Sequence, residues 1–300
     1  MVGYDADCRC ATNYLGAIER HFEQHPQSPG CSICFEHPLS GMLSAQIYQA
    51  VTAYELHLRY YVQALRFSGF PHADFTIGSC MAVRAEAYRG QGGMNKRKAG
   101  EDFYFLHKII PLGGFTALTG TTVYPSPRPS DRVPFGTGKA VRDILSGREI
   151  KTYPLEAFLD LKRLVDCVPR MYQRERPAEP LGLEELPASM RAFLTEQQFT
   201  AALTEICRNV SSEAAFCKRF FQWFDGIRAR KFVHHARDRF YGEGGLREQA
   251  GRLLGAMNCL QTGDSNLALG EMLQIYRNCD RMPGLRTSWA QCAPDPRIAR

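Results

Sequence analysis

The sequence contains no long apolar run. Of its 300 residues, 44% are hydrophobic and 23% are charged, yet no stretch approaches the roughly 20 apolar residues that a membrane-spanning helix needs. The first ten residues, MVGYDADCRC, lack the basic region and following apolar run of a secretory signal peptide. This composition is typical of a globular protein. We expect it in the cytoplasm, free or peripheral to the inner face of the membrane.

A dense basic stripe is also missing. The formal net charge is only +6. It suits an anionic ligand or an anionic membrane surface, but most such surpluses are only solvated surface. Nucleic-acid-binding proteins usually concentrate basic residues on one face or along one helix. We therefore expect no nucleic-acid partner.

The eleven cysteines form an odd set without a secretory context, so free thiols are expected rather than disulfides. Cys8 and Cys10 make a C-x-C pair, and Cys31 and Cys34 make a C-x-x-C pair. Four thiolates can bind zinc, but C-x-C is poor spacing for a zinc finger. The sequence favours idle thiols over a zinc site.

Strand and helix patterns alternate in the first half of the chain. This alternation predicts an α/β layered domain over residues 1–150, with a mostly parallel sheet in residues 1–125. Residues 125–139 are rich in proline and glycine and are expected to form a long loop, of the kind that often carries function. The segments expected as strands are 1–4, 31–35, 75–83 and 115–124, and those expected as helices are 14–23, 50–65 and 100–110.

The second half is periodic in the manner of helices. Residues 151–300 are expected to form a helical C-terminal region, with a helical bundle over residues 155–280. Apolar side chains that share one helix face should be buried in it. They are Phe216, Phe220, Trp223 and Ile227, followed by a second set, Leu253, Leu254 and Met257.

Asp5 and Asp7 are the first candidate site residues. Side chains two positions apart at the end of a strand share one face, so both carboxylates can point at one cation. Two hard oxygen donors suit Mg²⁺ or Mn²⁺ that bridges a diphosphate. The alternative is that they are ordinary aspartates of a turn.

Glu101 and Asp102 follow a glycine at the start of a predicted helix. Carboxylates in the first turn of a helix stabilise it by capping free N–H groups and by interacting with its dipole. The functional alternative is a general base held rigidly at the helix terminus. The basic run 96–98 just before them is either a solvated surface or a contact for an anionic acceptor.

Arg128 and Arg132 lie in the long loop. Guanidinium groups there could fold over a diphosphate and stabilise the charge that develops on it as it leaves. The alternative is that both belong to an exposed surface loop.

The order of these motifs resembles that of family 2 glycosyltransferases. Asp5-Ala6-Asp7 is followed by Gly78-Ser79, then by Gly92-Gly93, then by Glu101-Asp102 at a helix start. The family has the A-type glycosyltransferase fold, a Rossmann-like α/β sheet. The resemblance covers about residues 1–140 and implies that this part is one half of such a domain, followed by the helical region.

The resemblance also implies roles. Asp5 and Asp7 would hold Mn²⁺ or Mg²⁺ on a nucleotide-sugar donor, and Asp102, with Glu101 as its neighbour, would deprotonate an acceptor hydroxyl. The sugar would be transferred with inversion to a carbohydrate or lipid-linked acceptor, through an oxocarbenium-like state. The residues that would help the metal to stabilise the departing diphosphate are Arg128 and Arg132.

In this family a nucleoside-binding half precedes the D-x-D motif, whereas Asp5 is four residues from the start. We therefore expect a fragment, a chain that works with a separate N-terminal half, or a protein that is no longer an enzyme. On its own, the chain should bind the cation weakly and transfer sugar poorly or not at all. The alternative functions are a non-catalytic binding or scaffold module and a peripheral membrane adaptor.

Overall fold

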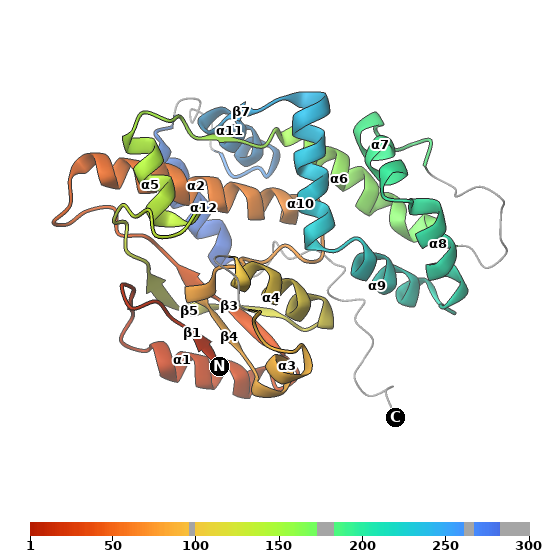
Figure 1. Ribbon diagram of the computed structural model, residues 1–300, viewed down its shortest axis with the longest axis horizontal. Helices are drawn as coiled ribbons and strands as arrows, with labels where there is room; N and C mark the ends of the chain where they lie inside the picture. The colour runs from red at the N-terminus through yellow and green to blue at the C-terminus, as the bar shows by residue number, and fades with distance from the viewer. Residues whose placement is uncertain (96–99, 173–182, 261–266, 283–300) are drawn as a thin grey trace. The chain divides into compact units, whose positions relative to one another are not determined.

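A computed structural model describes residues 1–95, 100–172, 183–260 and 267–282 (Figure 1). The basic run 96–98 lies outside these residues. The structure is mixed α/β, as the sequence predicts in general terms. Contacts divide the described chain into two compact units. Unit 1 contains Met1–Val62, Asp74–Lys151 and Gly245–Met282, and unit 2 contains Gln63–Ala73 and Thr152–Gly244.

The predicted division at residue 150 therefore falls at one of the places where the chain passes from one unit to the other. The helical C-terminal region is shared between the units, because residues from Gly245 onward group with the sheet-containing unit. No helix among the described residues combines the length and the apolar character needed to cross a bilayer.

Unit 1 is built on a mixed five-stranded sheet of order β1-β4-β3-β5-β2. Only the β3–β5 pair is parallel, and the other neighbouring pairs are antiparallel. The prediction of a mostly parallel sheet is therefore wrong. The strands are β1 Val2–Gly3, β2 Arg9–Cys10, β3 Gly30–Phe35, β4 Met81–Val83 and β5 Thr116–Tyr124.

The reason for the antiparallel arrangement is the path of the chain between β3 and β4. Ser32 pairs with Met81 and Gly30 with Val83, so β4 starts beside the middle of β3 and runs back to its first residue. The intervening helix α2, Ala45–Phe67, does not return the chain to the other end of the sheet as a βαβ crossover would. Alternation of helix and strand signals does not reveal this difference.

Helices cover both faces of the sheet. Alternate residues of β4 contribute to two hydrophobic clusters, because successive side chains of a strand point to opposite faces. Ala82 packs in a cluster with Ile18 of α1 (Tyr14–Gln24). Met81 and Val83 pack in a cluster with residues of α4 (Glu101–Ile109). The remaining α-helices of unit 1 are α3 Ala85–Gly90, α5 Thr137–Leu145, α11 Leu246–Ala256 and α12 Leu269–Arg281.

A buried network of charges joins α2 to α12 in unit 1. The Glu55 side chain is fully buried and accepts hydrogen bonds from Arg59 Nε and Arg277 Nε, each at 2.8 Å. It also accepts one from the backbone N–H of His37 at 2.7 Å. Arg59 in turn pairs with Asp280. Each buried charge therefore has a partner, which is the condition for tolerating it.

Unit 2 is helical, as expected for the residues after 150. Its helices are α6 Leu155–Cys167, α7 Ala188–Glu196, α8 Phe199–Arg208, α9 Glu213–Trp223 and α10 Gly226–Ala236, and a π-helical turn follows at Arg237–Tyr241. A separate two-stranded sheet consists of β6 Lys151–Thr152 and β7 Gly244–Gly245.

The predicted apolar stripe of residues 216–227 is only partly correct. Phe216 and Phe220 are fully buried, but α9 ends at Trp223, and Asp225 caps a new helix by accepting the N–H of Arg228 at 2.9 Å. The break rotates the face that the chain presents to the core. Trp223 and Ile227 are half-buried as a result, and Phe224 is fully buried instead.

Candidate functional site

Asp5 and Asp7 lie in the loop between β1 and β2. The backbone N–H of Cys8 donates to the Asp5 carbonyl at 3.0 Å and closes a turn. This turn, rather than the alternation of a strand, brings the side chains together, which corrects the predicted geometry. One ligand atom each of Asp5, Asp7 and Cys8 lies within 4.8 Å of the others. The two carboxylates can therefore face one cation.

The electrostatics of the pair also suit a cation. Although Asp5 as a residue is exposed, partial desolvation of its carboxyl group raises its pKa, and the charges of Asp7 and Glu101 raise it further. The charge of Arg132 and a hydrogen bond from Ser79 act in the opposite direction. Negative charge is thus concentrated at this loop, and a bound cation would relieve it.

The donor set fits a hard divalent cation in part. The carboxylates of Asp5 and Asp7 are the oxygen ligands that Mg²⁺ and Mn²⁺ prefer, whereas the soft sulfur of Cys8 is not. Burial raises the pKa of the Cys8 thiol, which keeps it protonated and a poor ligand. Phosphate oxygens and water would have to complete the coordination shell.

Asp102 is held at the start of α4 by backbone donors on both of its oxygens. Phe103 N donates to Oδ1 at 2.7 Å and Gly78 N donates to Oδ2 at 2.8 Å. Burial raises the pKa of Asp102, the charge of Glu101 raises it too, and these hydrogen bonds oppose the rise. Asp102 thus accepts a free N–H group in the first turn of α4, as the capping interpretation expects. A raised pKa also makes the group a stronger base than an ordinary aspartate.

Glu101 has an unusual environment. Its Oε2 atom is buried and has no hydrogen-bond partner among the described residues. The Glu101 charge acts on both Asp5 and Asp102, so the two acidic pairs lie near each other. A buried oxygen without a partner costs free energy. A ligand or cation that satisfied it would be stabilised.

The long loop folds onto the aspartates. Arg128 Nε donates to Asp7 Oδ2 at 2.8 Å, with both side chains partly exposed. The charge of Arg132 lowers the pKa of Asp5, so this arginine is also close. The predicted site residues therefore form one connected cluster, while their roles stay predictions.

Two residues near the cluster have surroundings that the sequence did not predict. Ser79 belongs to the Gly78-Ser79 motif, which implied no contact with the aspartates; its hydroxyl lies 3.7 Å from Cys80 Sγ and lowers the pKa of Asp5 and of Cys8. Tyr54 has its pKa raised to about 12 by burial and by the charge of Asp102. In the sequence Tyr54 is indistinguishable from the core positions of an amphipathic helix.

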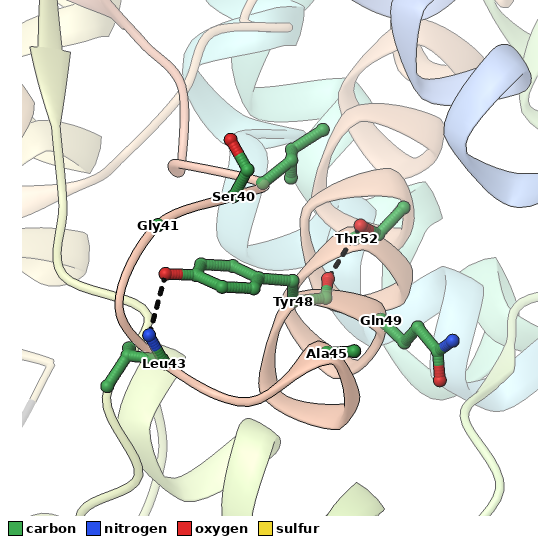
Figure 2. A pocket seen from close by; sticks show the side chains of 8 residues that line it. Ser40, Gly41, Leu43, Ala45, Tyr48, Gln49 and Thr52 are labelled. Atoms are coloured by element: carbon green, nitrogen blue, oxygen red, sulfur yellow. Dashed lines mark hydrogen bonds between the residues drawn. The ribbon is translucent and has the colours of Figure 1, made fainter.

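A surface hollow of about 450 Å³ lies at the beginning of α2 (Figure 2). Tyr48 points across it toward the preceding loop, and its hydroxyl accepts the N–H of Leu43 at 3.1 Å. No charged residue lines the hollow, so it offers no acid or base. Its lining consists of Leu39, Ser40, Gly41, Leu43, Ala45, Tyr48, Gln49 and Thr52.

No protein-family model matches the chain, and neither the curated proteins nor the solved structures contain a match to it. The resemblance to family 2 glycosyltransferases is therefore confined to the motifs Asp5-Ala6-Asp7, Gly78-Ser79, Gly92-Gly93 and Glu101-Asp102.

Proposed function

We propose that the cluster is the active site of a metal-dependent glycosyltransferase that moves a sugar from a nucleotide-sugar donor to an acceptor hydroxyl with inversion. The observation that carries the proposal is the convergence of two acidic pairs and an arginine loop from segments far apart in the sequence. Arg128 contacts Asp7 across 121 positions, and Glu101 acts on Asp5. Metal ligands, a base and cationic side chains are what this reaction requires together.

In this proposal each group of residues has a separate role. Asp5 and Asp7 hold Mg²⁺ or Mn²⁺, which when bound would neutralise charge on the donor diphosphate. Arg128 and Arg132 donate hydrogen bonds to the diphosphate as it leaves with the electron pair of the bond to the anomeric carbon. Asp102 accepts the proton of the acceptor hydroxyl while that oxygen forms the new bond to the anomeric carbon.

One observation favours a non-catalytic binding module as the second candidate. Both oxygens of Asp102 accept backbone N–H groups, which is also how a purely structural carboxylate is held. A binding module would retain the affinity for metal and diphosphate without turnover. The two candidates therefore differ in catalysis, and the binding of donor fragments is common to both.

The first test measures binding of a nucleoside diphosphate by calorimetry with and without Mn²⁺. We expect binding that depends on the metal and that weakens at least about tenfold in Asp5→Asn and Asp7→Asn, or ~1.4 kcal/mol. Asp131→Asn is the matched control, because this exposed aspartate lies in the loop that carries Arg128 and Arg132 and pairs with Arg142. Binding without metal, or binding unchanged in the Asp5 and Asp7 variants, would contradict the proposal.

A second test screens nucleotide sugars for release of the nucleoside diphosphate and for transfer to carbohydrate and lipid-linked acceptors. Metal-dependent release that is absent in Asp102→Asn supports the enzyme. Binding of the metal and diphosphate with no turnover for any donor, also when a nucleoside-binding half is supplied, would favour the binding module.

Arg128→Ala is expected to change two affinities in opposite directions. Without the guanidinium at 2.8 Å from Asp7, Mn²⁺ alone should bind more tightly, because a competing positive charge is gone. The Mn²⁺–nucleoside diphosphate complex should bind more weakly, by about 1.5–3 kcal/mol for a lost charged hydrogen bond.

Titrations of Mn²⁺ alone and of Mn²⁺ with nucleoside diphosphate measure both effects. Arg142→Ala serves as the control, since its partner is Asp131. If both affinities of Arg128→Ala fell together, the arginine would only be stabilising the loop.

A further inference from the structure

Two free thiols meet where α11 packs against α12 in unit 1. Helix α11 ends with Asn258 in the left-handed conformation, at a φ of 56°. The N–H of Asn258 donates to Gly255 O at 3.0 Å, and that of Cys259 donates to Leu254 O at 2.9 Å. This is a common way for a helix to end. It folds the chain back over the helix and fixes the backbone position of Cys259.

The second thiol belongs to Cys279, a buried residue of α12. The Sγ atoms of Cys259 and Cys279 are 3.7 Å apart, so the two sulfurs are in contact. Beside them the buried hydroxyl of Tyr276 donates to Ala250 O at 3.0 Å, which holds α12 against α11. The packing of the two helices therefore sets the distance between the thiols, although 20 positions separate them in the sequence.

The two thiols differ in exposure. Cys279 is 4% exposed, and burial raises the pKa of its thiol to about 12, which keeps it protonated at neutral pH. Cys259 is half-buried, so a small oxidant can reach its sulfur. Redox-sensitive cysteines have this arrangement, in which an accessible sulfur is oxidised first and a second thiol beside it resolves the product to a disulfide.

We propose that Cys259 and Cys279 form an oxidation site, at which a peroxide converts the two thiols to a reversible disulfide that ties α12 to α11. The Cys259 thiolate attacks one oxygen of hydrogen peroxide and the O–O bond breaks, which gives a sulfenic acid and a hydroxide that takes up a proton. Cys279 Sγ then attacks the sulfenic sulfur, and its proton leaves with the displaced hydroxide as water. The two sulfurs give up two electrons, and one peroxide is reduced to two waters. A dithiol reductant reverses the reaction.

The disulfide would brace the end of α12 that contributes to the buried charge network. Asp280, the residue after Cys279, pairs with Arg59, and Arg277 pairs with Glu55. A crosslink between residues 20 positions apart also restricts the unfolded chain. We therefore expect the oxidised chain to melt roughly 5–10 °C above the reduced chain.

Trypsin separates the two cysteines, which makes the crosslink easy to detect. Cleavage after each arginine leaves one cysteine in peptide 253–277 and one in peptide 278–281. The folded wild-type chain is treated with hydrogen peroxide, the remaining thiols are alkylated, and the digest is analysed by mass spectrometry. We expect the two peptides to be joined, and to separate after treatment with dithiothreitol. Cys34, another half-buried cysteine of unit 1, should still be alkylated.

Three variants test the assignment. Cys259→Ser should abolish both the joined peptide and the rise in melting temperature. Cys279→Ser should leave Cys259 as a sulfenic acid, which dimedone traps. Cys34→Ser is the matched control and should behave as wild type. Serine at the buried position 279 can lower stability, so Cys259→Ser at the half-buried position carries the test if Cys279→Ser does not fold.

Failure of the two peptides to join while Cys34 is oxidised would overturn the inference. Joining of Cys259 to a cysteine other than Cys279, or joining only in the presence of urea, would overturn it as well. A melting temperature that is unchanged or lower after oxidation would show that the bond does not brace α12. These measurements need neither metal, donor nor acceptor, so their outcome is independent of the proposed function.

Discussion

Asp102→Asn is expected to lower kcat for sugar transfer by about 10²–10⁴-fold, the usual contribution of a positioned general base. Asparagine keeps an oxygen that can accept the N–H of Gly78 and loses the acceptor for the N–H of Phe103, so the turn Gly78–Cys80 should stay in place at a small cost in the stability of the first turn of α4. It cannot take up the proton of an acceptor hydroxyl. Because the base acts in the transition state, the loss should appear in kcat, with the affinity for Mn²⁺ and nucleoside diphosphate nearly unchanged.

The pH dependence gives this prediction a second readout. Burial, followed by the charge of Glu101, raises the pKa of Asp102 above that of an ordinary aspartate. The base works only when it is ionised, so wild-type kcat/KM should fall as the pH drops through that raised pKa. This limb should disappear from any residual activity of Asp102→Asn.

Initial-rate profiles between pH 4 and pH 8 measure the effect, with Asp131→Asn as the control. Retention of wild-type turnover by Asp102→Asn would show that the base lies elsewhere. Glu101, whose Oε2 lacks a partner among the described residues, would then be the residue to replace.

The helices and strands that depend on local sequence could be predicted. The apolar spacing of residues 14–23 corresponds to α1, Tyr14–Gln24, and the glycine before the acidic pair marks the start of α4. Gly100 has a φ of 78°, a left-handed conformation that glycine adopts without strain. Helix propensity and the need for glycine at a left-handed position both depend on a few neighbouring residues. The sequence alone therefore predicted α1 and the start of α4.

Strand direction could not be predicted in this way. The segment 75–83 was expected as a single strand, but Gly78–Cys80 form a turn and only Met81–Val83 pair in the sheet. Whether β4 runs parallel or antiparallel to β3 depends on where the chain re-enters the sheet after α2. The point of re-entry depends on tertiary packing, and the alternation of apolar residues along a strand does not indicate it.

In the candidate site, too, the sequence predicted residues but not the contacts between distant segments. The acidic pairs and the arginines were identified from motif order and loop composition, and the structure brings them together. The contacts that hold them, such as the N–H of Gly78 with Asp102 Oδ2 at 2.8 Å, join segments that the motif order names without indicating that they touch. The buried charge network was the hardest feature to predict. Glu55 and Arg277 are 222 positions apart, and in the sequence each is typical of an exposed surface residue.

Removing the charge of Glu55 is the change expected to cost the most stability. Glu55→Ala would leave the buried guanidinium groups of Arg59 and Arg277 without their shared carboxylate. Breaking a buried ion pair in this manner typically lowers the free energy of unfolding by 3–5 kcal/mol. The control is Glu196→Gln, whose pair with Arg239 is exposed and should contribute at most about 1 kcal/mol.

The pH dependence of unfolding tests the same network in the wild-type chain. Burial alone would raise the pKa of Glu55, but hydrogen bonds from His37 and Arg277 and the charge of Arg59 outweigh it and hold that pKa well below its usual range. In the unfolded chain a glutamate titrates near pH 4.3. The network therefore contributes fully above about pH 4.3, and its contribution is lost as the pH falls further toward the lower folded pKa.

Urea unfolding measured at several pH values between 7 and 3 should show this loss in the wild type, and it should be smaller in Glu55→Gln. The double variant Glu55→Leu/Arg277→Met should be more stable than the sum of its single variants predicts, because it removes both a charge and its buried partner. Arg59 would still pair with Asp280 and with the carbonyl of Phe35 in that variant. Additive losses in the double variant, or a Glu55→Ala effect no larger than that of Glu196→Gln, would show that the network is not a coupled buried unit.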